Sequence, residues 1–194
     1  MTNNFFQKII TNTEIVNTLS EYYDFEIVDH TTNTNDYFFK ADQEINVIAK
    51  DASGGVFALI HSGYSDIFPV VYISSEGQAG KVGRSLEEFL TIMMVCPYWR
   101  DLLKFSDEGQ LSEMIKAQPF LIEDTLEDFP EIMSVKEYVL SILSLNEVNN
   151  PVELLHKSMV SEPHVSIYSL EDEKFESLFN SFVVTDNPLW KSKM

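Results

Sequence analysis

The segment from Asp42 to Ser106 constrains the fold more than any other part of the chain, because strand, turn and helix patterns follow one another in it. Three apolar runs, at residues 45–49, 56–60 and 68–73, have the length and composition of strands. The turn Asp51-Ala52-Ser53-Gly54-Gly55 separates the first two runs, and Asp and Gly favour hairpin turns. The pattern predicts an α+β fold with a central, mostly antiparallel sheet flanked by helices.

The end of this segment predicts an amphipathic helix. Ser85-Leu86-Glu87-Glu88 matches a capping box, in which Glu88 returns a hydrogen bond to the cap residue. Apolar side chains then recur on one helix face, and Pro97 ends the pattern. These apolar residues are Leu86, Phe89, Leu90, Met93 and Met94.

The flanking regions favour short helices and short strands. Before residue 42, we expect one or two helices over 5–22 and strands at 25–28 and 37–39. After residue 106, we expect a short helix ending before Pro119, a longer one over 132–143, a helix starting at Asn150-Pro151 and a strand at 164–170. A closing amphipathic helix would contain Phe175, Leu178, Phe179 and Phe182. The economical interpretation is one domain over 1–194, with its best-defined core at 42–106 and a helical C-terminal extension at 107–194.

Charge and aromatic content narrow the class of protein. The chain has 194 residues, is 44% hydrophobic, contains 14 Phe and 8 Tyr, and carries a formal net charge of −18. This aromatic content argues against intrinsic disorder. The negative charge disfavours nucleic acid and anionic membranes as partners, because both are bound through clustered Lys and Arg. It favours a basic protein partner, although solubility alone also explains it.

The chain start and the short apolar runs predict a protein that is cytoplasmic, at least at the point of synthesis. Met1-Thr2-Asn3-Asn4-Phe5 lacks the basic and apolar regions of a signal peptide, and the apolar runs are too short to cross a bilayer. The single cysteine, Cys96, excludes an internal disulfide and a zinc site with several cysteines. We expect Cys96 to be a buried structural thiol.

We find no catalytic, cofactor or metal residues in the sequence patterns. Around Gly77, Gly80 and Gly83 a phosphate loop would need Gly at Ser75 and a hydroxyl residue at Val82, so these glycines are interpreted as turns before the helix at Ser85. A Gly-x-Ser-x-Gly elbow and a second protease-type aspartate are also missing from the sequence. The histidines lack metal-ligand spacing; they are His30, His61, His156 and His164.

The run from Glu123 to Glu131 is strongly acidic and lacks the alternating ligands and central glycine of a calcium loop. It is either a solvated helix face or a surface that meets a basic partner through long-range attraction.

The order of features in 42–106 resembles the SUKH superfamily. The residues that carry the resemblance are Asp51, Gly54-Gly55-Val56-Phe57, Val70-Val71-Tyr72-Ile73 and Ser85-Leu86-Glu87-Glu88-Phe89-Leu90. The resemblance covers about a third of the chain and implies an α+β domain without catalytic residues. Many bacterial members are immunity proteins that neutralise a polymorphic toxin, often a nuclease, and eukaryotic relatives are regulatory interaction proteins.

We therefore expect a non-enzymatic binding protein, with no cofactor, that covers the active site of a basic, nuclease-like toxin. Carboxylates would steer the encounter and exposed aromatic side chains would anchor it. The candidate contacts are Tyr64, Tyr72, Glu76, Asp101, Asp124, Asp128 and Glu131. An intracellular regulatory scaffold and a hydrolase with an unmarked site remain alternatives, and the oligomeric state stays open.

Overall fold

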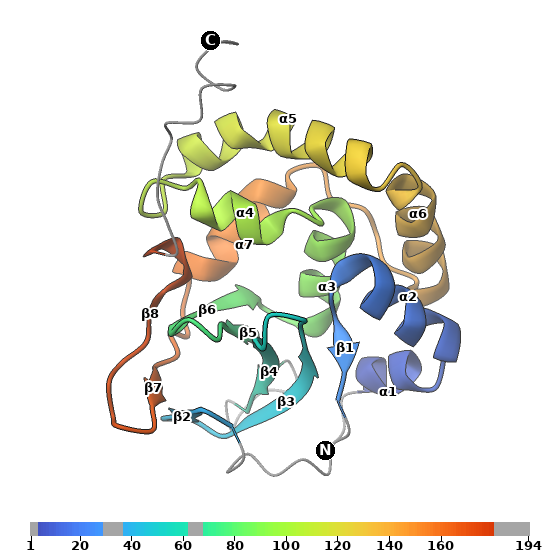
Figure 1. The fold of residues 1–194 in the computed structure, drawn as a ribbon. Helices are drawn as coiled ribbons and strands as arrows, with labels where there is room; N and C mark the ends of the chain where they lie inside the picture. Colours follow the sequence, from blue (N-terminus) through green and yellow to red (C-terminus); the bar gives the residue numbers. More distant parts are fainter. Residues whose placement is uncertain (1–3, 29–36, 62–67, 181–194) are drawn as a thin grey trace.

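A computed structural model describes residues 4–28, 37–61 and 68–180 and confirms the α+β fold (Figure 1). The helices are α1 (Asn4–Ile10), α2 (Thr13–Tyr23), α3 (Leu86–Val95), α4 (Trp99–Lys104), α5 (Leu111–Asp128), α6 (Ile132–Leu143) and α7 (Pro151–Val160), with a final 3-10 turn, η2 (Leu178–Asn180). The strands are β1 (Glu26–Ile27), β2 (Phe39–Ala41), β3 (Ile45–Lys50), β4 (Val56–Ile60), β5 (Val70–Ile73), β6 (Gln78–Gly83), β7 (Ile167–Ser169) and β8 (Glu176–Ser177).

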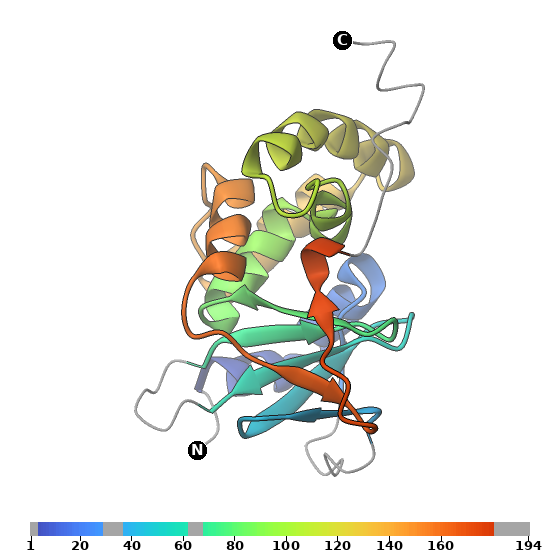
Figure 2. The ribbon, with the colours of Figure 1, turned by 90° about the vertical axis from the view of Figure 1, so that its left-hand side faces the viewer.

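Six strands form the main sheet in the order β1-β3-β4-β5-β6-β8. Its neighbours are antiparallel except β6 and β8, which run parallel. The helices lie on one side of this sheet, and the antiparallel pair β2–β7 lies against the other (Figures 1 and 2).

Both faces of the central strands are buried, which explains why β4 is a continuous apolar run. Phe57 and Leu59 contribute to the core under the helices. Val56, Ala58 and Ile60 contribute to a smaller core on the side of β2 and β7. Alternate residues of one strand therefore serve two cores.

The predicted hairpin turn joins β3 to β4. The Asp51 backbone N–H donates to the Gly55 carbonyl (2.9 Å), and Gly54 has a φ of 89°, a conformation in which glycine carries no steric penalty. The turn therefore holds Asp51 at the end of the sheet.

The predicted cap of α3 is formed only in part. The Glu88 backbone N–H donates to Ser85 Oγ (3.1 Å), as predicted. The Glu88 carboxylate, however, accepts from the Arg84 backbone N–H (3.0 Å) and from Ser158 Oγ (2.8 Å). The glutamate thus links α3 to α7 instead of closing the capping box on Ser85.

The interpretation of Gly77, Gly80 and Gly83 as turns is wrong for two of the three residues. Gly77 lies in a turn with a φ of 86°, but Gly80 and Gly83 belong to β6. A Cβ on Gly83 would lie 2.6 Å from Phe89 Cβ, and a Cβ on Gly80 would lie 2.8 Å from Met159 Cε. These glycines let α3 and α7 approach the sheet closely.

Two helix predictions in the second half of the chain are also wrong. Helix α5 does not end before Pro119 but continues through it to Asp128. Phe175 does not open a closing helix: its backbone N–H donates to Ile167 O (2.8 Å), and β8 then joins β6. Segment 107–180 therefore contributes strands as well as helices, and Phe182 lies outside the described residues.

Candidate functional site

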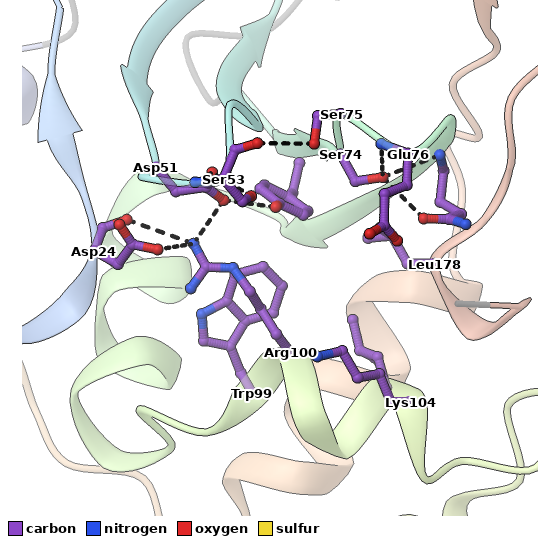
Figure 3. Close-up of a pocket in the computed structure, with 13 residues that line it drawn as sticks. Asp24, Asp51, Ser53, Ser74, Ser75, Glu76, Trp99, Arg100, Lys104 and Leu178 are labelled. Carbon is purple, nitrogen blue, oxygen red and sulfur yellow. Dashed lines mark hydrogen bonds and ion pairs between the residues drawn. The ribbon is translucent and has the colours of Figure 1, made fainter. Parts of the chain in front are cut away.

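A cavity of about 240 Å³ lies where the β3–β4 turn, the β5–β6 turn and α4 meet (Figure 3). Its lining comprises Asp24, Asp51, Ser53, Tyr72, Ser74, Ser75, Glu76, Gln78, Trp99, Arg100, Leu103, Lys104 and Leu178.

Asp51 is the central residue of this cavity and is surrounded by donors. Its Oδ1 accepts from Ser53 N (3.0 Å), Ser53 Oγ (2.7 Å) and Gly55 N (2.8 Å). Its Oδ2 accepts from Tyr72 Oη (2.6 Å) and Arg100 Nη2 (3.1 Å). Burial alone would raise the pKa of Asp51, but these donors and the Arg100 charge outweigh it, so the pKa lies below its ordinary value.

Arg100 reaches Asp51 across a surface of aromatic rings. Its guanidinium carbon lies 4.7 Å from the Trp99 ring centroid, 5.2 Å from that of Tyr72 and 5.5 Å from that of Phe57. This stacking is favourable for a planar cation. Within the described residues, the buried Arg100 Nε and Trp99 Nε1 have no hydrogen-bond partner.

This arrangement ties three elements together and is poorly suited to acid–base chemistry. A carboxylate whose pKa is lowered and whose lone pairs are occupied is a weak base near neutral pH. Burial, followed by the hydrogen bond to Asp51, raises the pKa of Tyr72 to about 12, so its hydroxyl keeps its proton. The site connects the hairpin, β5 and α4.

Of the predicted contacts, Tyr72 and Glu76 line this cavity, but Tyr72 is not an exposed anchor. Its side chain is only 5% exposed because its ring packs on Phe57 and Trp99. Glu76 is exposed in the β5–β6 turn. Asp101 pairs with Lys104 at the surface of α4 (3.1 Å). Tyr64 lies outside the described residues.

The other predicted contacts lie elsewhere, around the junction of α5 and α6. Asp124 and Asp128 are exposed on α5, and Glu131 is exposed directly before α6 (Figure 1). Burial, Glu21 and then Glu131 raise the pKa of Tyr22, which places Glu131 beside α2. The structure therefore divides the predicted contacts between two places.

A groove near this junction was missed by the sequence analysis. It has a volume of about 350 Å³ and lies between α5, α6 and the segment before α7. Its lining comprises Met94, Val95, Pro97, Tyr98, Gln118, Ile122, Thr125, Leu126, Ile132, Met133, Lys136, Glu147, Val148, Asn149 and Pro151. The sequence shows only part of this lining, the spacing of Ile122 and Leu126 on one helical face, and that face is recognisable only if the helix continues beyond Pro119.

The remaining candidates for chemistry have structural surroundings. Cys96 is buried, as predicted, and burial raises the pKa of its thiol to about 12. His156 Nε2 lies 2.9 Å from the Gly109 carbonyl oxygen, and the His61 ring packs at a tilt against the Phe68 ring. Within residues 4–28, 37–61 and 68–180, no cluster of His, Cys, Asp or Glu could hold a metal ion. No helix in these ranges is both long and apolar enough to traverse a bilayer.

Comparisons of the chain with protein-family models, curated protein sequences and solved structures found no significant match.

Proposed function

We propose that this chain is a binding protein of the immunity type, which neutralises a basic, nuclease-like toxin by covering its active site. The resemblance of residues 42–106 to the SUKH superfamily and the net charge of −18 support this function.

The observation that carries the proposal is the acidic surface at the end of α5. We define this surface by Glu123, Asp124, Glu127, Asp128 and Glu131, all of which are exposed. No Lys or Arg occurs between positions 123 and 131. Large apolar side chains are exposed among these carboxylates, including Leu126 (39%) and Phe129 (45%). Charge that speeds association and apolar area that slows dissociation are thus combined in one surface.

The mechanism follows from the chemistry of the target. A nuclease binds a polyanion, so its active-site cleft is lined by cations. The acidic surface offers carboxylates to those cations and competes with phosphates for them. While the acidic surface fills the cleft, nucleic acid cannot enter it. Occupation of the cleft is therefore enough to abolish the nuclease activity of the toxin.

The proposal is tested by affinity capture from a lysate of the source organism at about 0.05 M and about 0.5 M NaCl, conditions that differ strongly in screening. The test variant neutralises four carboxylates of the acidic surface: Glu123→Gln, Asp124→Asn, Glu127→Gln and Asp128→Asn. The matched control removes the same charge elsewhere from four exposed residues: Glu162→Gln, Glu171→Gln, Glu173→Gln and Glu176→Gln.

We expect the wild-type chain and the control to retain one basic protein at low salt and the test variant to lose it. The purified captured protein should cleave nucleic acid, and stoichiometric wild-type chain should stop that cleavage. Several non-basic partners held equally by all three chains would instead indicate a regulatory scaffold and would overturn the proposal, as would a captured protein without nuclease activity.

A further inference from the structure

Helix α5 has two apolar faces, of which the fold covers one. Met114, Ala117 and Leu121 are buried against the core. On a neighbouring face, Ile122 and Leu126 are each 39% exposed and line the groove between α5 and α6. An apolar helix face that the described part of the chain leaves exposed is characteristic of an interaction surface.

Helix α6 supplies the opposite wall of this groove. The side chain of Met133 is 49% exposed there, whereas the preceding residue, Ile132, is only 3% exposed. Tyr98 and Pro97, which follow α3, also line the groove. Methionine is flexible and polarisable, and it adapts to the shape of an incoming apolar side chain.

The rim of the groove is negative. Glu123 and Glu127 are exposed and each follow a groove residue by one position, so they lie about 100° further around α5 than Ile122 and Leu126. Among the described residues that line the groove, Lys136 is the one cation, and its Nζ is bound to Glu147 Oε1 at 2.7 Å. An apolar floor with a negative rim is complementary to an amphipathic segment that carries Lys and Arg.

We propose that this groove seats the apolar face of a basic amphipathic helix of the partner. The inference rests on the proposed function, since it assigns the partner contact next to the acidic surface. A second copy of this chain is a poorer occupant, because each copy brings a net charge of −18 and the same negative rim.

The test uses a designed peptide and does not depend on the natural partner. The probe has about 18 residues, with Leu on one helical face and Lys elsewhere, a length that supports helix formation. One control peptide has the same composition in scrambled order, and another replaces Lys by Glu. Binding is followed by the methyl NMR signals of Ile122, Leu126 and Met133.

We expect the Leu/Lys helix to shift these three methyl signals, while the scrambled and acidic peptides leave them in place. Ile122→Ser should weaken the binding by about tenfold, the loss typical of an interface anchor. Ile115→Ser is the matched control, because Ile115 is exposed to a similar degree (45%) on the same helix but does not line the groove.

Equal binding of the scrambled peptide, or equal losses for Ile122→Ser and Ile115→Ser, would overturn the groove as the seat. So would a dimer that forms through the groove and disappears in Ile122→Ser, measured by sedimentation. These results leave the capture experiment unaffected: a basic nuclease lost only by the acidic-surface variant would uphold the proposed function without the groove.

Discussion

At the scale of single residues, Asp51 shows how a turn residue becomes a junction. Its carboxylate binds the backbone of its own hairpin and two side chains from β5 and α4. Asp24, at the end of α2, adds a second carboxylate by accepting from Ala52 N (2.8 Å). The sequence predicted the turn role of Asp51, but its partners Tyr72 and Arg100 are 21 and 49 positions away, and no local pattern relates them.

Replacing Tyr72 by Phe removes the hydroxyl that donates to Asp51 Oδ2 and leaves the ring packing in place. We expect the free energy of unfolding to fall by about 1.5–3 kcal/mol, the value of a hydrogen bond to a charged group. Chemical denaturation measures this change. The control is Tyr138→Phe, whose hydroxyl interacts with Glu14 at the surface; its loss should lower the free energy of unfolding clearly less than the loss of the Tyr72 hydroxyl does. Equal losses in both variants would contradict the role of the junction.

The pH dependence of stability follows from Asp51 and Glu88, whose pKa values are both lowered in the folded chain. Groups of this kind stabilise the fold fully above their unfolded pKa, at about pH 4, and the contribution is lost as the pH falls through the folded pKa. We expect unfolding free energies to be steady between about pH 7 and about pH 5 and to drop below about pH 4. Asp51→Asn should be less stable at neutral pH and should show a shallower drop. An unchanged slope in Asp51→Asn would show that other groups cause the acid sensitivity.

At the scale of elements, helix α5 shows where local rules fail. Proline lacks an N–H donor and crowds the preceding turn, so Pro119 predicts a helix end. The helix nevertheless continues, because Met114, Ala117 and Leu121 on both sides of the proline are buried against the core. Tertiary packing of that face outweighs the local cost. The same limit applies to β6, whose glycines fit a turn locally but serve close contacts with α3 and α7.

The cost of this proline is measurable at a site of low burial, since Pro119 is exposed. Pro119→Ala should raise the free energy of unfolding by roughly 1–3 kcal/mol, because the variant regains a helical hydrogen bond and a better propensity. Ser112→Ala, an exposed change in the first turn of α5, should stay within about 0.5 kcal/mol. A destabilised Pro119→Ala would mean that the proline sets a bend which the packing of α5 needs.

At the scale of the whole molecule, the net charge of −18 bears on two properties, the attraction of a basic partner and the response of stability to salt. Composition gave the net charge, the acidic run 123–131 indicated the carboxylates at the end of α5, and apolar patterning predicted most strands and helices. The groove required knowledge that α5 and α6 meet, which depends on contacts between distant residues. Sequence patterns of one element report its own faces, and a cavity between elements has no local signature.

A net charge of −18 also predicts how the fold responds to salt, because like charges repel one another in the compact state. The midpoint of thermal unfolding should rise as NaCl increases from about 0.02 M to about 0.5 M, since the Debye length shortens over that range. The acidic-surface variant, with four carboxylates fewer, should show a smaller rise. A midpoint that is constant or falls with added salt would show that ion pairs outweigh the repulsion.

The pairing of β2 with β7 has a consequence for the order in which the chain is made. Residues 39–41 lie opposite residues 167–169, so β2 cannot form its pair until β7 has been synthesised. During synthesis on a ribosome, the apolar side of the sheet that Ile167 helps to cover stays open until residues 167–169 have been translated. The nascent chain therefore exposes the apolar surface on this side of the sheet for a long interval. During that interval a chaperone would bind this surface and prevent aggregation.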